Sequence, residues 1–227
     1  MNILKKSTSY YILLSLFFLF FSINANKKLA LPTINISKQL AASNFNPEFT
    51  RIFSLGQKRL LSSLLWSKTL LESDVDHYKS HDLNSWLFLR FRTLMTLEPN
   101  FYEVYLYGGQ YLSVIKDDLN GATYLFDRGL EKFPNDYKML YHAGFHFYTE
   151  TKDFSKAKNI FTKLVKQPDI LSKFPMAPKI LARIEEKNNN PDAVLEILKD
   201  TYNRLPEDHF LKKAYESAIK KILEKAP

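Results

Sequence analysis

Two consecutive stretches of this chain carry the same pattern of small and aromatic residues, and no other feature restricts the possible folds so strongly. Each copy has a glycine within an apolar stretch, then a polar turn, then an alanine followed by a phenylalanine. The residues are Gly108, Ala122 and Phe126 in the first copy, and Gly144, Ala157 and Phe161 in the second. Small residues let two helices cross closely, and the phenylalanine fills the space between them. The pattern therefore predicts antiparallel helix pairs that repeat along the chain.

The two copies resemble the tetratricopeptide repeat, a family of stacked helix pairs. The first copy matches the family pattern before its turn at Val104, Tyr107, Gly108 and Tyr111, and the second at Leu140, Ala143, Gly144 and Phe147. Compared with the family pattern, the first copy has two extra residues and the second copy has one extra residue. We place these extra residues in the turns. The resemblance covers residues 86–206, closely in these two copies and loosely on either side. It implies an all-α fold, an α-solenoid of helix pairs, of an exported or membrane-anchored bacterial type.

The first 25 residues have the composition of an export signal. Lys5 and Lys6 precede an apolar run from Tyr10 to Ile23, and small or polar residues follow it. This order is typical of a secretory signal peptide, although an uncleaved anchor over residues 7–25 and a buried core helix are alternatives. With a signal or an anchor, the remainder of the chain is extracytoplasmic: periplasmic, secreted or held at the inner membrane.

The other boundaries follow from local patterns. Residues 26–45 contain Pro32 and no sustained helical period, which indicates a linker. Asn46-Pro47-Glu48 has the composition of a helix start, so residues 46–85 are expected to form an N-terminal helical segment. Residues 207–227 read as a capping helix with apolar residues inward, Phe210 and Ala214 among them, and five lysines, including Lys212, outward.

Composition and motifs exclude several classes of protein. The chain has no cysteine, so it has neither disulfides nor a thiol nucleophile, and its net charge of +8 comes from lysines interleaved with acidic residues. The sequence contains no recognisable motif of an enzyme or of a phosphate-binding loop. We therefore expect no enzyme activity, no cofactor, no nucleic acid and no small-molecule substrate.

Two polar clusters offer an alternative. His142, His146 and Glu150 lie on one face of a predicted helix, at a spacing that zinc ligands use, which suggests a metal-binding or hydrolytic protein. The order of residues differs from that of the metalloprotease helix, and we favour histidines on the surface or between helices. A second cluster in residues 72–84 contains Asp74, Asp76, His77, His81 and Asp82, and we interpret it as a solvated loop.

The resemblance also implies a binding groove along the first helix of each pair. The matching positions are Tyr102, Tyr105, Gly109, Leu112 and Ser113, and then Lys138, Tyr141, Phe145, Tyr148 and Thr149. Five aromatic side chains there exceed what packing requires. We expect them to bind a peptide or helix of a protein partner in an envelope complex, which makes the chain a scaffold or assembly factor. In the alternative, the C-terminal helix or residues 26–45 fill the groove, and the chain is a structural spacer.

Overall fold

The computed structural model describes residues 2–28, 36–80 and 82–224, and all regular structure in these ranges is helical. The chain divides into two compact units, Met1–Ser37 and Lys38–Pro227. The first unit contains α1 (Asn2–Lys28), which includes the predicted signal or anchor segment. The described apolar side chains of α1 from Tyr11 to Ile23 are exposed. Among the described residues, no helix combines the length and the hydropathy that a membrane crossing requires.

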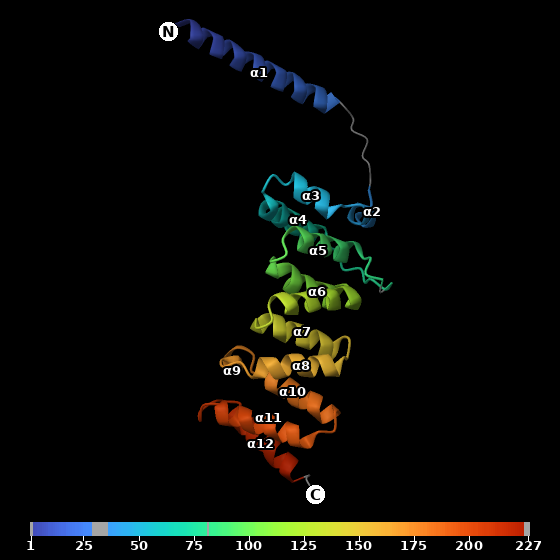
Figure 1. Ribbon diagram of the computed structural model, residues 1–227, viewed down its shortest axis with the longest axis vertical. Helices are drawn as coiled ribbons and strands as arrows, with labels where there is room; N and C mark the ends of the chain where they lie inside the picture. Colours follow the sequence, from blue (N-terminus) through green and yellow to red (C-terminus); the bar gives the residue numbers. More distant parts are fainter. Residues whose placement is uncertain (1, 29–35, 81, 225–227) are drawn as a thin grey trace. The chain divides into compact units, whose positions relative to one another are not determined.

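The second unit is a succession of helices (Figure 1). In chain order they are α2 (Lys38–Ser43), α3 (Pro47–Phe53), α4 (Lys58–Glu72), α5 (Trp86–Leu97), the π-helices η1 (Val104–Gly108) and η2 (Tyr111–Ile115), α6 (Leu119–Lys132), α7 (Tyr137–Thr149), α8 (Phe154–Val165), α9 (Ile170–Lys173), α10 (Ala177–Lys187), α11 (Pro191–Arg204) and α12 (Lys212–Leu223). Helices α6, α7 and α8 pack one on the next, as do α10, α11 and α12, while α2, α3 and α4 all pack on α5. The all-α prediction is confirmed.

Short polar side chains start several of these helices. Each accepts a hydrogen bond from a backbone N–H of the first turn, which has no partner within the helix. The capping residues are Asn46 for α3, Ser85 for α5, Asp118 for α6, Asp136 for α7, Asp153 for α8 and Asn190 for α11. The helix start predicted at Asn46-Pro47-Glu48 is among them and is confirmed.

Three turns between helices share one backbone geometry. A residue with positive φ precedes the capping residue in each: Asp117 (φ 55°) before α6, Lys152 (φ 57°) before α8, and Asn189 (φ 53°) before α11. A single left-handed residue reverses the chain within a short distance, although it is unfavourable for side chains other than glycine. The same local solution therefore joins η2 to α6, α7 to α8, and α10 to α11.

The helix pairs meet at the small residues that the sequence pattern selects. A Cβ atom on Gly144 would lie 3.0 Å from the Phe161 ring, and Ala157 and Phe161 are fully buried beside it. This contact between α7 and α8 is confirmed. In the first copy, Ala122 and Phe126 are also buried, but Phe126 packs on Gly109, where a Cβ atom would lie 2.9 Å from the ring, and not on Gly108.

The π-helices explain this shift by one residue. A π-turn holds one residue more than an α-turn, and the first copy of the repeat contains two π segments, η1 and η2. In η2 the backbone N–H of Lys116 donates to the carbonyl of Tyr111, five residues earlier, at 3.1 Å. The prediction that the two extra residues of this copy lie in the turn is therefore wrong, because the helix absorbs them.

The predicted linker needs correction, whereas the predicted N-terminal segment is helical as expected. Within residues 26–45, Lys38–Ser43 form α2, whose Ala42 is buried and which packs on α5; residues 29–35 lie outside the described part. The segment 46–85 contains two helices, because Leu55 (φ 49°) and Gly56 (φ 85°) turn the chain between α3 and α4. Short helices such as α2 have little periodicity to detect.

The C-terminal helix begins later than expected. It starts at Lys212, and Phe210, predicted to face inward, is 80% exposed, as Ala214 is exposed too. Lys212, predicted to face outward, is buried, and its Nζ donates to the Leu205 carbonyl at 3.3 Å and to Glu207 Oε1 at 2.7 Å. Tyr215 is buried instead, and the other apolar residues predicted to face inward, Leu211, Ala218, Ile219 and Ile222, pack against the same core cluster as expected.

Asp118 links two helix pairs, and its replacement by alanine is expected to lower the free energy of unfolding by about 2 kcal/mol. The side chain is completely buried, accepting from Ser85 Oγ at 2.5 Å and from the Gly121 N–H at 2.9 Å. Alanine leaves both donors without a partner. Urea denaturation is the measurement, and Asp153→Ala is the control, since Asp153 caps α8 from an exposed position and should cost about 1 kcal/mol. Equal losses in both variants would contradict the role of the buried Ser85 contact.

Candidate interaction surface

One face of α7 carries the predicted groove residues of the second copy. Lys138, Tyr141, Phe145 and Tyr148 are three or four residues apart, so they form one stripe along the helix. Asp136 starts this helix by accepting from the Met139 N–H at 2.8 Å. The opposite face buries Leu140, Ala143 and Phe147. Phe145 is 41% exposed, and Tyr141 and Tyr148 are half-buried.

Phe174 extends this stripe from another segment. Its ring stacks on Tyr141 with centroids 4.5 Å apart and an interplanar angle of 21°, and Tyr141 in turn stacks on Phe145 at 6.3 Å. The three rings form what we call the aromatic row. Ile170, fully buried in α9, fixes the segment that carries Phe174. The sequence reasoning missed Phe174, which lies next to Pro175 in a segment without helical periodicity.

A hollow of about 660 Å³ adjoins the aromatic row. We call it the Lys138 hollow; its lining consists of Tyr102, Asn135, Asp136, Tyr137, Lys138, Lys173 and Phe174. Lys173 places its ammonium 4.2 Å from the centre of the Tyr137 ring. Aromatic walls with two lysines at the rim suit a peptide that offers apolar and acidic side chains.

Tyr102 fixes one wall of this hollow. Its Oη donates to Asp136 Oδ1 at 2.5 Å, which connects the start of the first helix pair to the start of α7. Burial raises the pKa of Tyr102 well above its ordinary value, and the Asp136 carboxylate raises it further. The phenol therefore remains a hydrogen-bond donor throughout the physiological pH range.

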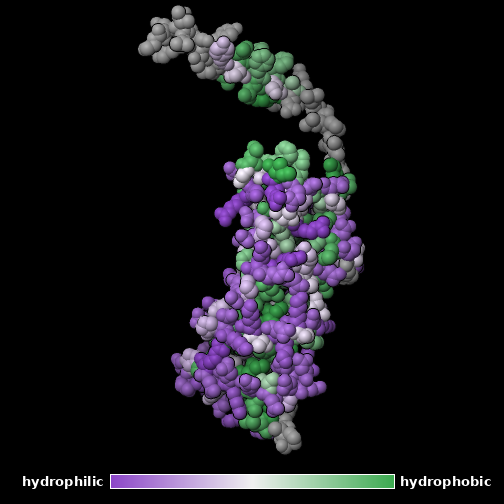
Figure 2. Space-filling view, viewed as in Figure 1, coloured by the Kyte–Doolittle hydropathy of each residue, from purple (hydrophilic) through white to green (hydrophobic). Residues whose placement is uncertain are grey.

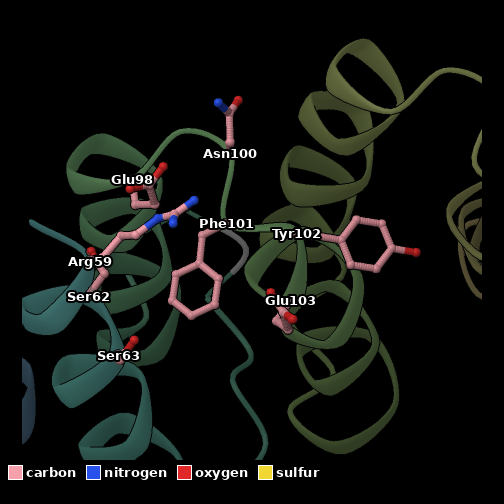
Figure 3. Close-up of a pocket in the computed structure, with 8 residues that line it drawn as sticks. All are labelled: Arg59, Ser62, Ser63, Glu98, Asn100, Phe101, Tyr102 and Glu103. Atoms are coloured by element: carbon pink, nitrogen blue, oxygen red, sulfur yellow. The ribbon is translucent and has the colours of Figure 1, made fainter.

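A second hollow, of about 340 Å³, lies on the other side of Tyr102 (Figure 3). We call it the Ser62 hollow; its lining consists of Arg59, Ser62, Ser63, Glu98, Asn100, Phe101, Tyr102 and Glu103. In Figure 3 the Tyr102 ring points away from Arg59 and Glu98. Ser62 is 1% exposed, and its Oγ has no hydrogen-bond partner among the described residues. Tyr102 is a lining residue of both hollows.

The first copy of the repeat contributes less to the surface than predicted. Tyr105 is 2% exposed and its Oη donates to the Pro99 carbonyl at 2.7 Å, while Leu112 is fully buried. Their assignment to a binding groove is wrong, and Tyr107, expected in the packing, is half-exposed. The extra residues of the π-helices rotate the side chains relative to an α-helix. Of the residues expected there, Tyr102 remains accessible, whereas Gly109 and Ser113 are buried.

His146 belongs to the core, where it is 2% exposed. Its Nδ1 lies 2.7 Å from Ser113 Oγ and its Nε2 lies 2.9 Å from Thr123 Oγ1, so both ring nitrogens are engaged by hydroxyl groups. Burial lowers the pKa of His146 to about 4, with a smaller contribution from Lys156. His142 and Glu150 line a cavity of about 50 Å³ beside it. Within the described ranges, no group of three or more histidine and acidic side chains is arranged to hold a metal ion.

Asp74 gives the polar segment 72–84 a structural role. It pairs with Lys116 at the end of η2 and with Lys38 of α2, the latter at 3.1 Å. Burial alone would raise the pKa of the Asp74 carboxyl, but the hydrogen bonds from both ammonium groups hold it below the ordinary value. The interpretation of this cluster as a solvated loop is therefore incomplete, because Asp74 attaches it to two helices. His81 lies outside the described residues.

These features define an all-α protein with an open aromatic row and two adjoining hollows. No protein-family model matches the chain, and a search of curated proteins finds no significantly similar sequence.

Proposed function

We propose that this chain is a non-catalytic scaffold or assembly factor of tetratricopeptide type, an α-solenoid that binds a protein partner. Support for the architecture comes from three helix pairs whose internal turns share one geometry, and from the small residues at which the pairs cross. Stacked pairs of this kind present extended surfaces to peptides and helices.

The observation that carries the binding proposal is the aromatic row beside the Lys138 hollow. Phe145 is exposed, Tyr141 and Phe174 are held in a stack, and Lys138 and Lys173 lie at the rim. Rigid aromatic side chains supply contact area with few rotatable bonds to immobilise. The partner is a peptide or helix with apolar side chains for the row and acidic ones for the rim.

The proposed location is the extracytoplasmic side of a membrane. This rests on the basic and apolar segments at the amino terminus, with Lys5 and Lys6 ahead of the run from Tyr10 to Ile23. The partner would then belong to an envelope complex, and residues 7–25 would attach the chain to the membrane if they are not removed.

One observation favours a second function, that of a structural spacer. Phe174 is a residue of this chain and already covers one side of Tyr141. The side chain that covers Tyr141 therefore comes from the segment after α9. It does not come from the C-terminal helix or from residues 26–45. The metal-binding or hydrolytic alternative has less support, because a metal ion would have to displace one of the hydroxyl groups bound to His146.

The double variant Phe145→Ala/Lys138→Ala is expected to weaken partner binding by about tenfold while leaving thermal unfolding nearly unchanged, because both side chains are exposed. Partners are first identified by a photocrosslinker placed at position 145 in the full chain, and the affinity of the purified partner is then measured. The matched control is Phe210→Ala/Lys213→Ala, which removes an exposed aromatic and an exposed lysine near the start of α12. Equal affinity of both double variants for the partner would refute the site, and the absence of any specific crosslink would favour the spacer.

A further inference from the structure

The end of the second unit formed by α3 and α4 carries an exposed apolar surface that the proposed partner site does not use. Its six side chains are between 56% and 88% exposed, and we call them the α3–α4 patch: Phe49, Ile52, Phe53, Leu55, Leu60 and Leu64. Phe49, Ile52 and Phe53 share one face of α3, as Leu60 and Leu64 share one face of α4. Figure 2 shows hydrophobic surface gathered at this end of the unit. Such a patch on a folded protein marks an interaction surface.

The form of the patch distinguishes among partners. No residue of α3 is buried, and Leu55 is the most exposed of the six, on the left-handed turn that it forms with Gly56. None of the six lines a hollow described above. The patch therefore protrudes. A helical or extended peptide requires a groove, whereas the fluid interior of a lipid bilayer adapts to a protruding apolar surface.

The charges around the patch indicate which kind of lipid surface it would contact. Residues 46–72, which include both helices, contain four basic side chains, Arg51, Lys58, Arg59 and Lys68, against two acidic side chains, Glu48 and Glu72. Glu48 pairs with Arg51 at 2.9 Å, and Glu72 pairs with Lys68 at 3.7 Å. Lys58 and Arg59 are exposed and form no ion pair with a described residue. Basic side chains beside exposed apolar ones are typical of segments that lie on anionic lipid.

The connection to α1 gives a further argument for a lipid partner. The described apolar side chains of α1 are 41% to 67% exposed, so this helix too presents apolar surface. Between Lys28 and Lys38 the chain can span at most about 36 Å, since one residue extends by no more than about 3.6 Å. If α1 binds lipid, that length limits how far the second unit can move from the same surface.

From these observations we propose that the α3–α4 patch rests on an anionic lipid surface. Phe53 and Leu55 lie among the acyl chains, and Lys58 and Arg59 contact the headgroups. The proposal is independent of the partner site on α7.

The test places a fluorescent probe on the patch of the full chain. Phe53→Trp is mixed with vesicles of phosphatidylcholine and phosphatidylglycerol that contain brominated acyl chains, and wild type supplies the background from Trp66 and Trp86. We expect strong quenching of the added tryptophan. The matched control Phe210→Trp places the probe near α12, at a site that is 80% exposed against 63% for Phe53, and no quenching is expected there. The comparison reports the position of the patch even if α1 itself binds the vesicles.

Second substitutions separate the apolar and the electrostatic contributions. In the Phe53→Trp background, Ile52→Asp/Leu55→Asp should reduce the quenching at least about fivefold, because charged side chains enter the acyl region unfavourably. Lys58→Glu/Arg59→Glu should reduce it on anionic vesicles and have little effect on pure phosphatidylcholine.

Two results would overturn the proposal. In the first, the protein floats with the vesicles while Phe53→Trp remains unquenched, which would mean that the patch faces away from lipid. In the second, the Phe53→Trp emission shifts to the blue with increasing protein concentration in the absence of vesicles, which would show that a second copy of the chain covers the patch.

Discussion

Phe161→Ala is expected to lower the free energy of unfolding by about 3–5 kcal/mol, the range for deleting a buried phenylalanine. The ring is fully buried between α7 and α8, against Gly144 and close to Tyr141 at a centroid distance of 6.3 Å. Alanine leaves a cavity where the two helices cross, and a close-packed pair cannot collapse into it without moving one helix. Chemical denaturation followed by circular dichroism measures the loss.

Phe210→Ala is the matched control for this substitution. Phe210 is 80% exposed, so its truncation should change the free energy of unfolding by no more than about 0.5 kcal/mol. A loss below about 1 kcal/mol for Phe161→Ala would show that the two helices do not depend on this contact, and the repeat interpretation would lose its main support.

Acidification is expected to destabilise the protein through His146 by about 3 kcal/mol between pH 6.5 and pH 4. Burial holds the pKa of His146 at about 4 in the folded state, against an ordinary value of 6.5. Above pH 6.5 the imidazole is neutral in both states and has no effect. As the pH falls below 6.5, the unfolded chain takes up a proton that the folded chain does not bind, so stability falls at about 1.36 kcal/mol per pH unit until the folded state also protonates near pH 4.

The measurement compares the pH dependence of unfolding in wild type and in His146→Gln. Other groups titrate in both proteins, so the difference between the two curves isolates His146. The curves should converge as the pH falls from 6.5 to 4. His142→Gln serves as a control for a neighbouring histidine, whose pKa burial and Lys138 also lower. Parallel curves for wild type and His146→Gln would contradict the buried, neutral imidazole.

The second copy of the repeat was more predictable from sequence than the first. In α7, Leu140, Ala143, Gly144 and Phe147 are buried and Phe145 is exposed, as the α-helical period requires. In η1 and η2 the same assumption fails, because two π-turns change the angle between successive side chains. Tyr105 and Leu112 consequently enter the core. A count of residues reveals that two are extra, but not whether a turn or a helix contains them.

The candidate site was only partly predictable for a different reason. Lys138, Tyr141, Phe145 and Tyr148 belong to one helix, and a local period is enough to place them on one face. Phe174 reaches Tyr141 from a segment more than thirty residues later, and Tyr102 reaches Asp136 over a similar separation. Contacts at this separation depend on how the helix pairs stack, and no local pattern encodes them.

The position of Tyr102 between the two hollows has a consequence for binding. The hydrogen bond from its Oη to Asp136 Oδ1 holds one rotamer, in which the ring points away from Arg59 and Glu98 of the Ser62 hollow and lies in the wall of the Lys138 hollow. A partner side chain that enters the Lys138 hollow and displaces the ring must also break that bond, which leaves the Asp136 carboxylate without the phenol donor. The lost hydrogen bond then reduces the affinity of any partner that needs the space of the ring. A partner that leaves the ring in place keeps the bond, so the phenol selects for side chains that fit beside it.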